Sequence, residues 1–248
     1  MKKILFLLVL CFGFQKSHSQ VLMSLIFGDK LNSPNIEFGL EGGANFSTIS
    51  NLDSDHRTDF NLGFYFDFNL KNPSWMFNTG VIVKSTMGAD NVAIYSLNDE
   101  KLDAVFAEGS VKRTINYFNV PLMIKYKFDN NIYIKVGTQL GLLSTANDMF
   151  HQNYYGDDLE YKNNIRDKIH VVDAGLALGL GYRLKTGKYG MNLGLQYYYG
   201  LVPLLKGDNS PTQYNRSLYV TAGLPIGKGK AAKKAAEKKK KAEEGLGQ

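Results

Sequence analysis

The chain has 248 residues, of which 44% are hydrophobic and 21% are charged, and its mean hydropathy is −0.22. Residues 1–19 contribute +3 and residues 227–248 contribute +5 to the formal net charge of +6, which leaves −2 for residues 20–226. The basic isoelectric point therefore comes from the two ends. It does not indicate a nucleic-acid-binding protein, because no basic-aromatic motif occurs between those ends.

The N-terminus has the pattern of a secretory signal peptide. Two lysines precede an apolar run over residues 4–14, and small residues stand at both cleavage positions before a site after Ser19. The run is too short to cross a membrane as a helix. Cys11 is the only cysteine, but Leu10 precedes it where a lipoprotein signal needs a small residue, so we expect cleavage after Ser19. Residues 20–35 then form a periplasmic N-terminal segment.

Eight segments of the body alternate between apolar side chains and polar or small ones. This period of two places successive side chains on opposite faces of a strand. None of the eight apolar faces carries Asp, Glu, Lys or Arg. In the third segment this phase places Ser85 and Met87 on the apolar face and Lys84 on the other. The predicted strands cover residues 36–47, 60–70, 75–87, 117–128, 132–142, 172–184, 189–201 and 217–226.

Short and long connections alternate along the chain. Residues 72–74, 129–131 and 186–188 have the composition of tight turns, whereas residues 48–59, 88–116, 144–171 and 202–216 are predicted as long loops. Short periplasmic turns and long extracellular loops are typical of outer-membrane barrels. The sequence therefore predicts an all-β fold, an eight-stranded antiparallel transmembrane β-barrel over residues 36–226. Both termini are then periplasmic.

A soluble barrel with its apolar faces turned inward is the rival architecture. Its outer face would be rich in Lys and Glu. The non-apolar faces here consist mainly of Gly, Asn and Gln, which suit the crowded lumen of a narrow barrel, so the membrane interpretation is favoured.

Three segments resemble the PorT-like outer membrane β-barrel family. They are FGLEGGANFS at residues 38–47, YFNVPLMIKY at 117–126 and NRSLYVTAG at 215–223, and the resemblance spans residues 36–226. It implies the barrel fold and no particular activity. The family's namesake takes part in type IX secretion and gliding. One departure is Ile226, which stands where many barrels have a terminal aromatic residue.

The predicted lumen contains four acidic and five basic side chains. Two interpretations remain open: a selective pore or acid–base site, and a polar plug. We favour the plug, because an eight-stranded barrel is only wide enough for its own side chains. This lumen charge network consists of Glu37, Glu41, Asp67, Lys84, Lys125, Lys127, Lys135, Asp173 and Arg183.

An outer-membrane enzyme is a weaker alternative. His56, His151 and His170 lie in or near predicted loops, and Ser144 and Asp148 are close to His151 in sequence. No Gly-x-Ser-x-Gly, His-Glu-x-x-His or paired-histidine motif occurs, so we predict no catalytic residue, metal or cofactor.

Residues 227–248 form a Lys/Ala/Glu-rich tail, predicted to be periplasmic. Its positive charge suits attachment to peptidoglycan, to lipid headgroups or to another envelope protein, although a tail without a partner is equally compatible with the composition. We expect a monomeric barrel in contact with outer membrane lipid, acting as an envelope structural or interaction component, for example as an accessory of a secretion or uptake complex. A small porin is the first alternative and a lipid-modifying enzyme the second.

Overall fold

The computed structural model describes residues 33, 35–72, 74–154, 157–184, 190–207 and 210–226. The predicted signal peptide, nearly all of segment 20–35, the turn at 186–188 and the tail 227–248 lie outside the described residues. The elements are β1 (Ile36–Ile49), β2 (Asp55–Asn69), β3 (Trp75–Val92), α3 (Glu100–Val105), β4 (Ser110–Lys127), β5 (Ile132–Tyr154), β6 (Asp157–Asn164), the 3₁₀ turn η1 (Arg166–Lys168), β7 (Val172–Arg183), β8 (Asn192–Gly200) and β9 (Asn215–Pro225).

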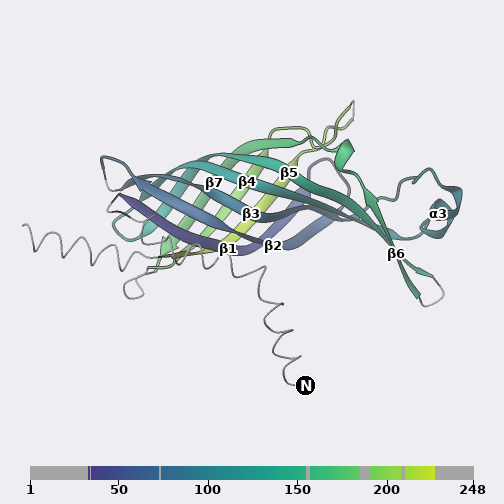
Figure 1. The fold of residues 1–248 in the computed structure, drawn as a ribbon, viewed down its shortest axis with the longest axis horizontal. Coiled ribbons are helices and arrows are strands. Elements are labelled where there is room, and N and C mark those ends of the chain that lie inside the picture. Colours follow the sequence, from purple (N-terminus) through teal and green to yellow (C-terminus); the bar gives the residue numbers. More distant parts are fainter. Residues whose placement is uncertain are drawn as a thin grey trace, which may run out of the picture.

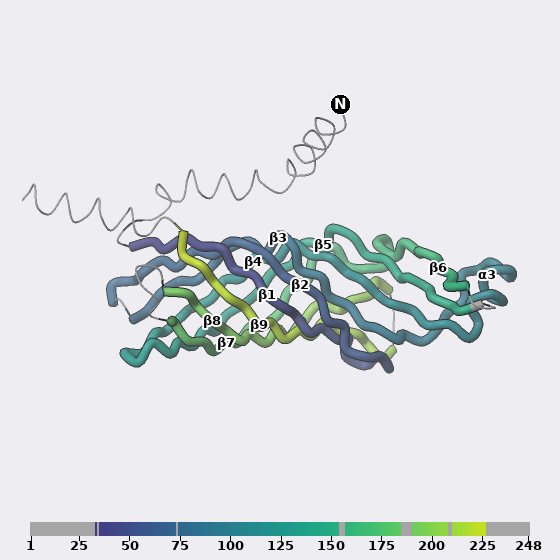
Figure 2. The backbone as a smooth tube through the Cα atoms, turned by 90° about the horizontal axis from the view of Figure 1, so that it is seen from below, coloured from purple at the N-terminus to yellow at the C-terminus, as the bar shows by residue number. Residues whose placement is uncertain are grey.

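Eight of these strands close into a barrel (Figure 1, Figure 2). Their order is β4-β3-β2-β1-β9-β8-β7-β5, and β5 pairs with β4 to complete the ring. Every pairing is antiparallel, including that between the first and last strands. The predicted eight-stranded antiparallel barrel is therefore confirmed. β6 is an additional strand, and it joins the sheet through β5.

The outer wall of the barrel is an apolar band. Alternate residues of each strand face outward, and the exposed fraction reaches 64% at Leu178, 58% at Val136 and 53% at Leu176. The polar and charged side chains of the same strands are buried inside, as with Asp67 at 1%. This arrangement is the reverse of a soluble barrel and is the one that a transmembrane barrel presents to lipid.

The pattern reverses beyond this band, where β3, β4 and β5 continue past the predicted strand ends. Their inward side chains become apolar, including Met87, Ile115 and Leu143, while Lys112 of β4 faces outward. β3 and β5 have a bulge at this change, whereas the alternation of β4 continues through it. The prediction of residues 88–116 and 144–171 as loops is thus wrong for much of their length. In these stretches the apolar side chains face inward and the polar ones face outward. This pattern does not resemble a lipid-facing strand, but it suits a strand that is surrounded by water.

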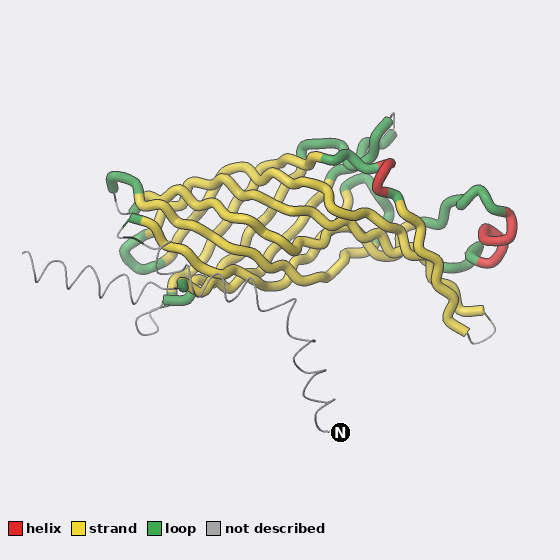
Figure 3. The backbone as a smooth tube through the Cα atoms, viewed as in Figure 1, coloured by secondary structure: helices red, strands yellow, loops and turns green. Residues whose placement is uncertain are grey.

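β5 and β6 form an arm that extends past the barrel (Figure 1). β4 pairs with the other side of β5 as far as His151, so only the tip of the arm is two-stranded. We call β5 residues 147–154 together with β6 the arm. The end of the barrel that carries the arm is the arm end, and the opposite end of the barrel is the short-turn end. The loop that carries α3 lies at the same end, where the loops are longer (Figure 3). The Asp99 carboxylate caps α3 by accepting hydrogen bonds from two backbone N–H groups. Among the described residues, no helix is long and apolar enough to cross a membrane.

Candidate functional site: a filled lumen and a folded arm

Two ion pairs lie inside the barrel near the short-turn end. Arg183 Nη2 of β7 is 2.7 Å from Glu37 Oε2 of β1, and Lys125 Nζ of β4 is 2.7 Å from Asp67 Oδ2 of β2. Each pair joins strands that are not neighbours in the barrel wall: Lys125–Asp67 spans β3, and Arg183–Glu37 spans β9 and β8. The structure therefore brings four of the predicted network residues together as pairs.

Neutral side chains complete the hydrogen bonding of these pairs. Tyr65 donates its hydroxyl to Glu37 at 3.1 Å, and Asn78 donates to the second oxygen of Asp67 at 2.7 Å. The Lys125 ammonium also lies 4.3 Å from the centre of the Tyr133 ring. A buried charge is tolerated only when it is paired and its remaining bonding positions are satisfied, and both conditions are largely met here.

The other predicted interior residues occupy separate places. Lys135 is buried, and its alkyl chain lies against Gly179, where a β-carbon would be 2.6 Å from Lys135 Cγ. Glu41 stands opposite two glycines in the register, and Lys127 is half-buried at the end of β4. Asp173 lies apart from the ion pairs, nearer the arm end, where it accepts a hydrogen bond from Asn215 at 2.9 Å.

Lys84 does not belong to this network. β3 has an extra residue at Val83, since Ile82 pairs with Gly63 while Lys84 pairs with Leu62. One inserted residue reverses which face the following side chains take. Lys84 is consequently exposed on the outside, with its ammonium 5.7 Å from the Phe60 ring centre. Ser85 and Met87, predicted to face outward, are buried inside at 1% exposure each.

The middle of the lumen is filled by neutral polar side chains. Gln196 donates to Gln139 at 3.2 Å, Ser85 and Tyr219 share a hydrogen bond of 3.3 Å, and Asn119 donates to Ser85 at 2.9 Å. Tyr219 is 0% exposed and Gln139 1%. These side chains fill this part of the lumen and leave almost none of their own surface accessible to water.

An apolar core closes the arm end above these polar side chains. It combines inward residues of the extended strands with side chains from the loop before β4 and from the segment after β6. Phe150 of β5 is at its centre, where the Tyr95 and Phe106 rings contact it edge-on at 5.2 and 5.9 Å between centroids. The buried members are Ile49, Met87, Ala89, Val92, Phe106, Val111, Ile115, Tyr117, Leu143, Ala146, Phe150, Ile165, Ile169, Tyr198, Leu204 and Tyr219.

One buried ion pair holds this core to the arm. Arg113 of β4 donates to both carboxylate oxygens of Asp148, at 2.9 and 2.7 Å, and Tyr95 donates to the same carboxylate at 2.8 Å. Burial and the adjacent Asp148 charge raise the pKa of the Tyr95 hydroxyl, which therefore remains protonated as a donor. Asn163 of β6 in turn donates to the Tyr95 oxygen at 2.9 Å. Arg113 was missed in the sequence because this residue lies in a predicted loop, outside the alternating strands.

His151 does not assemble with the serine and carboxylate of the enzyme alternative. His151 Nδ1 is 3.2 Å from Glu160 Oε1 on β6, whereas Asp148 is bound by Arg113 and Tyr95. Ser144 accepts through its backbone carbonyl from Arg166. Within the described ranges, no three His, Cys, Asp or Glu side chains are grouped so as to hold a metal ion.

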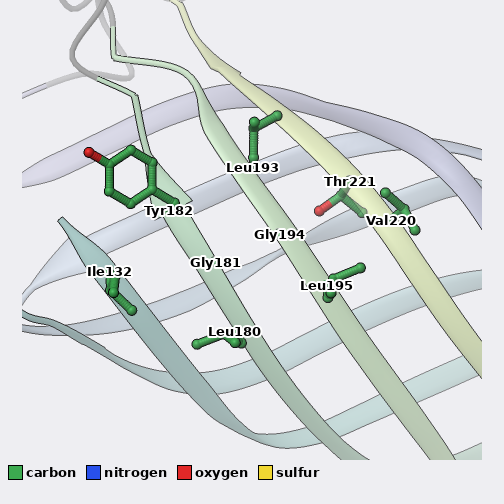
Figure 4. Close-up of a pocket in the computed structure, with 9 residues that line it drawn as sticks. All are labelled: Ile132, Leu180, Gly181, Tyr182, Leu193, Gly194, Leu195, Val220 and Thr221. Atoms are coloured by element: carbon green, nitrogen blue, oxygen red, sulfur yellow. The ribbon is translucent and has the colours of Figure 1, made fainter.

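Two hollows lie on the outside of the barrel wall and the arm. The first, about 500 Å³, is lined by apolar side chains of β5, β7, β8 and β9, and its floor includes Gly181 and Gly194 (Figure 4). It opens on the apolar band and therefore faces lipid. The second, about 520 Å³, is polar and lies against the arm, where Glu108, Asp158 and Glu160 contribute carboxylates.

One comparison with known proteins shows the family of the chain. The model of the family described as outer membrane protein beta-barrel domain matches residues 27–206. No curated protein matches. Similar solved structures include Neisserial surface protein A (13% identity, 76% of this chain and 96% of that chain, TM-score 0.37), Ail of Yersinia pestis (10%, 77% and 99%, 0.37) and OprG from Pseudomonas aeruginosa (14%, 79% and 97%, 0.42).

Proposed function

The chain belongs to the outer membrane protein β-barrel domain family, and we propose that it is a closed barrel of the outer membrane that carries a folded interaction arm outside the cell. In this proposal the short-turn end faces the periplasm, as is usual for bacterial barrels. The three segments that resemble PorT-like barrels support membership of that subgroup. They also favour a role as an accessory of a secretion or uptake complex over a role as a pore.

The filled lumen is the observation that carries this proposal. Ion pairs occupy the short-turn end, neutral polar side chains occupy the middle, and an apolar core occupies the arm end. Opening a path would require several buried hydrogen bonds to break together, since each layer joins different strands. A small porin, the first alternative, would need such a path.

Single-channel recording in planar bilayers tests closure. The purified full chain should give no discrete conductance steps, and a general porin in the same bilayer serves as the positive control. Regular steps from the parent protein would refute the closed barrel and support the porin alternative.

Surface labelling tests the orientation. An epitope tag inserted between β5 and β6 should bind antibody on intact cells, whereas a tag after Gln248 should require permeabilised cells. The reverse result would place the arm in the periplasm.

Affinity purification from native membranes tests the interaction role. The matched variant replaces arm residues 152–159 by a short Asn-Gly turn, which removes the tip and leaves Arg113, Asp148 and Asn163 in place. A partner should accompany the parent and be lost from this variant. Equal recovery from both would show that the arm does not recruit it.

A further inference from the structure

The outer edge of β6 is an unpaired strand edge. All eight residues of β6 pair with β5 on one side, from Tyr154 opposite Asp157 to Asn147 opposite Asn164. On its other side, the described part of the chain supplies no backbone hydrogen bond to residues 157–164. Alternate N–H and C=O groups of an antiparallel edge strand point away from its neighbour. β6 therefore presents a row of donors and acceptors.

This edge is held in its extended conformation by the rest of the arm end. Leu159 and Tyr161 pack against the apolar core, and the Tyr161 ring lies 6.3 Å from the Phe106 ring centre. Asn163 is fixed by its bond to Tyr95. Because the strand is already ordered before binding, little conformational entropy is lost when a second strand pairs with it.

The surroundings of the edge are acidic. Residues 157–164 contain three carboxylates and one lysine, and the loop at 93–109 contains four carboxylates and one lysine. Glu108, Asp158 and Glu160 meet at the polar hollow beside the arm. Since the acidic groups outnumber the basic ones, a second copy of this arm would bring like charges together, whereas a basic strand would bring opposite charges together.

We propose that the free edge of β6 binds an extended, cationic segment of a partner polypeptide by strand addition. Main-chain hydrogen bonds to the edge supply the pairing, and basic side chains of the partner lie against Asp158 and Glu160. This inference rests on the proposed function, because it assigns a partner chemistry to the arm.

Two synthetic peptides of equal charge test strand addition. The first alternates lysine and valine over seven residues, and the second replaces each valine by proline, which cannot pair along a strand. The full-length protein in lipid nanodiscs is titrated with each peptide, and hydrogen exchange is followed over residues 157–164. The valine peptide should bind and slow this exchange, whereas the proline peptide should do neither. Equal binding of both, or unchanged exchange, would overturn the proposal.

A matched pair of variants tests the charge. Glu160→Lys should weaken the valine peptide about fivefold, since it removes one exposed attraction and adds a repulsion. Asp53→Lys makes the same charge change in the exposed loop before β2 and should leave the affinity unchanged. Hydrogen exchange without peptide verifies that β6 remains folded in both variants. Equal weakening by the two would show a net-charge effect and overturn the assigned site.

Sedimentation of the protein without peptide tests whether a second copy of the chain occupies the edge of β6. Concentration-dependent dimerisation that slows hydrogen exchange over residues 157–164 would make a second copy the occupant and overturn the proposal. The two proposals fail separately. If the barrel conducts, the closed-barrel function fails whatever the peptides do. If the barrel is closed and the arm-tip replacement loses a native partner while the valine peptide does not bind, only strand addition fails.

Discussion

Removal of the Lys125 ammonium would show whether the lumen is a dry plug. In the parent, Lys125 is 4% exposed, Asp67 is 1% exposed, and their charged atoms are 2.7 Å apart. Lys125→Met keeps most of the side-chain volume but leaves the Asp67 carboxylate buried without a counter-ion. Breaking a buried pair in this way costs about 3–5 kcal/mol. Asn78 still donates to the carboxylate, which favours the lower end, about 3 kcal/mol.

The loss corresponds to more than a hundredfold in the folding equilibrium, about 1.4 kcal/mol for each factor of ten. Urea unfolding in lipid vesicles measures it, with heat-modifiable gel migration and the fluorescence of Trp75, the single tryptophan, as readouts. The control is Asp67→Asn with Lys125→Met, which removes both charges and should restore stability to within about 1 kcal/mol of the parent.

A small effect would refute the reasoning. If Lys125→Met alone unfolds within about 0.5 kcal/mol of the parent, the carboxylate must be solvated by water in the lumen. The interior would then be hydrated, and the main support for a closed barrel would be lost.

Three further tests address the wall, the arm end and the tail. Leu178→Arg on the apolar band should cost about 2–4 kcal/mol in vesicle unfolding, whereas Thr145→Arg, outward on β5 beyond the bulge, should cost almost nothing. The pKa of Asp103 is lowered by hydrogen bonds from the Ser96 hydroxyl and the Leu97 N–H. Because the folded pKa lies below the unfolded one, near 4, this contribution is complete above that pH and disappears as the pH falls through the folded value. The protection factor of the Leu97 amide, its exchange rate relative to an unstructured amide at the same pH, should fall over that acidic range, and in Asp103→Asn it should not change with pH there. Deletion of residues 227–248 should leave barrel unfolding unchanged, with an Ile226→Phe version as the control for assembly. Unfolding of the deleted barrel even with Phe at that position would contradict a tail outside the barrel.

The amino-acid sequence by itself was sufficient for the barrel and its apolar band. Residues 60–69 alternate strictly, and the structure places Phe60 and Leu62 outside and Asn61 and Asp67 inside. A period of two and a requirement for an uncharged lipid face are local properties, so they can be read from one segment at a time.

The tertiary structure decided which interior charges pair and where the arm begins. Glu37 and Arg183 are 146 residues apart, and only closure of the barrel brings them to 2.7 Å. The bulge at Val83 moved Lys84 outside because one inserted residue reverses a face without disturbing the composition. β6 was missed because its sequence is polar, and its extended form depends on pairing with β5 and on packing against Phe106 and Phe150. Its two apolar positions, Leu159 and Tyr161, are too short an alternation to predict a strand by themselves.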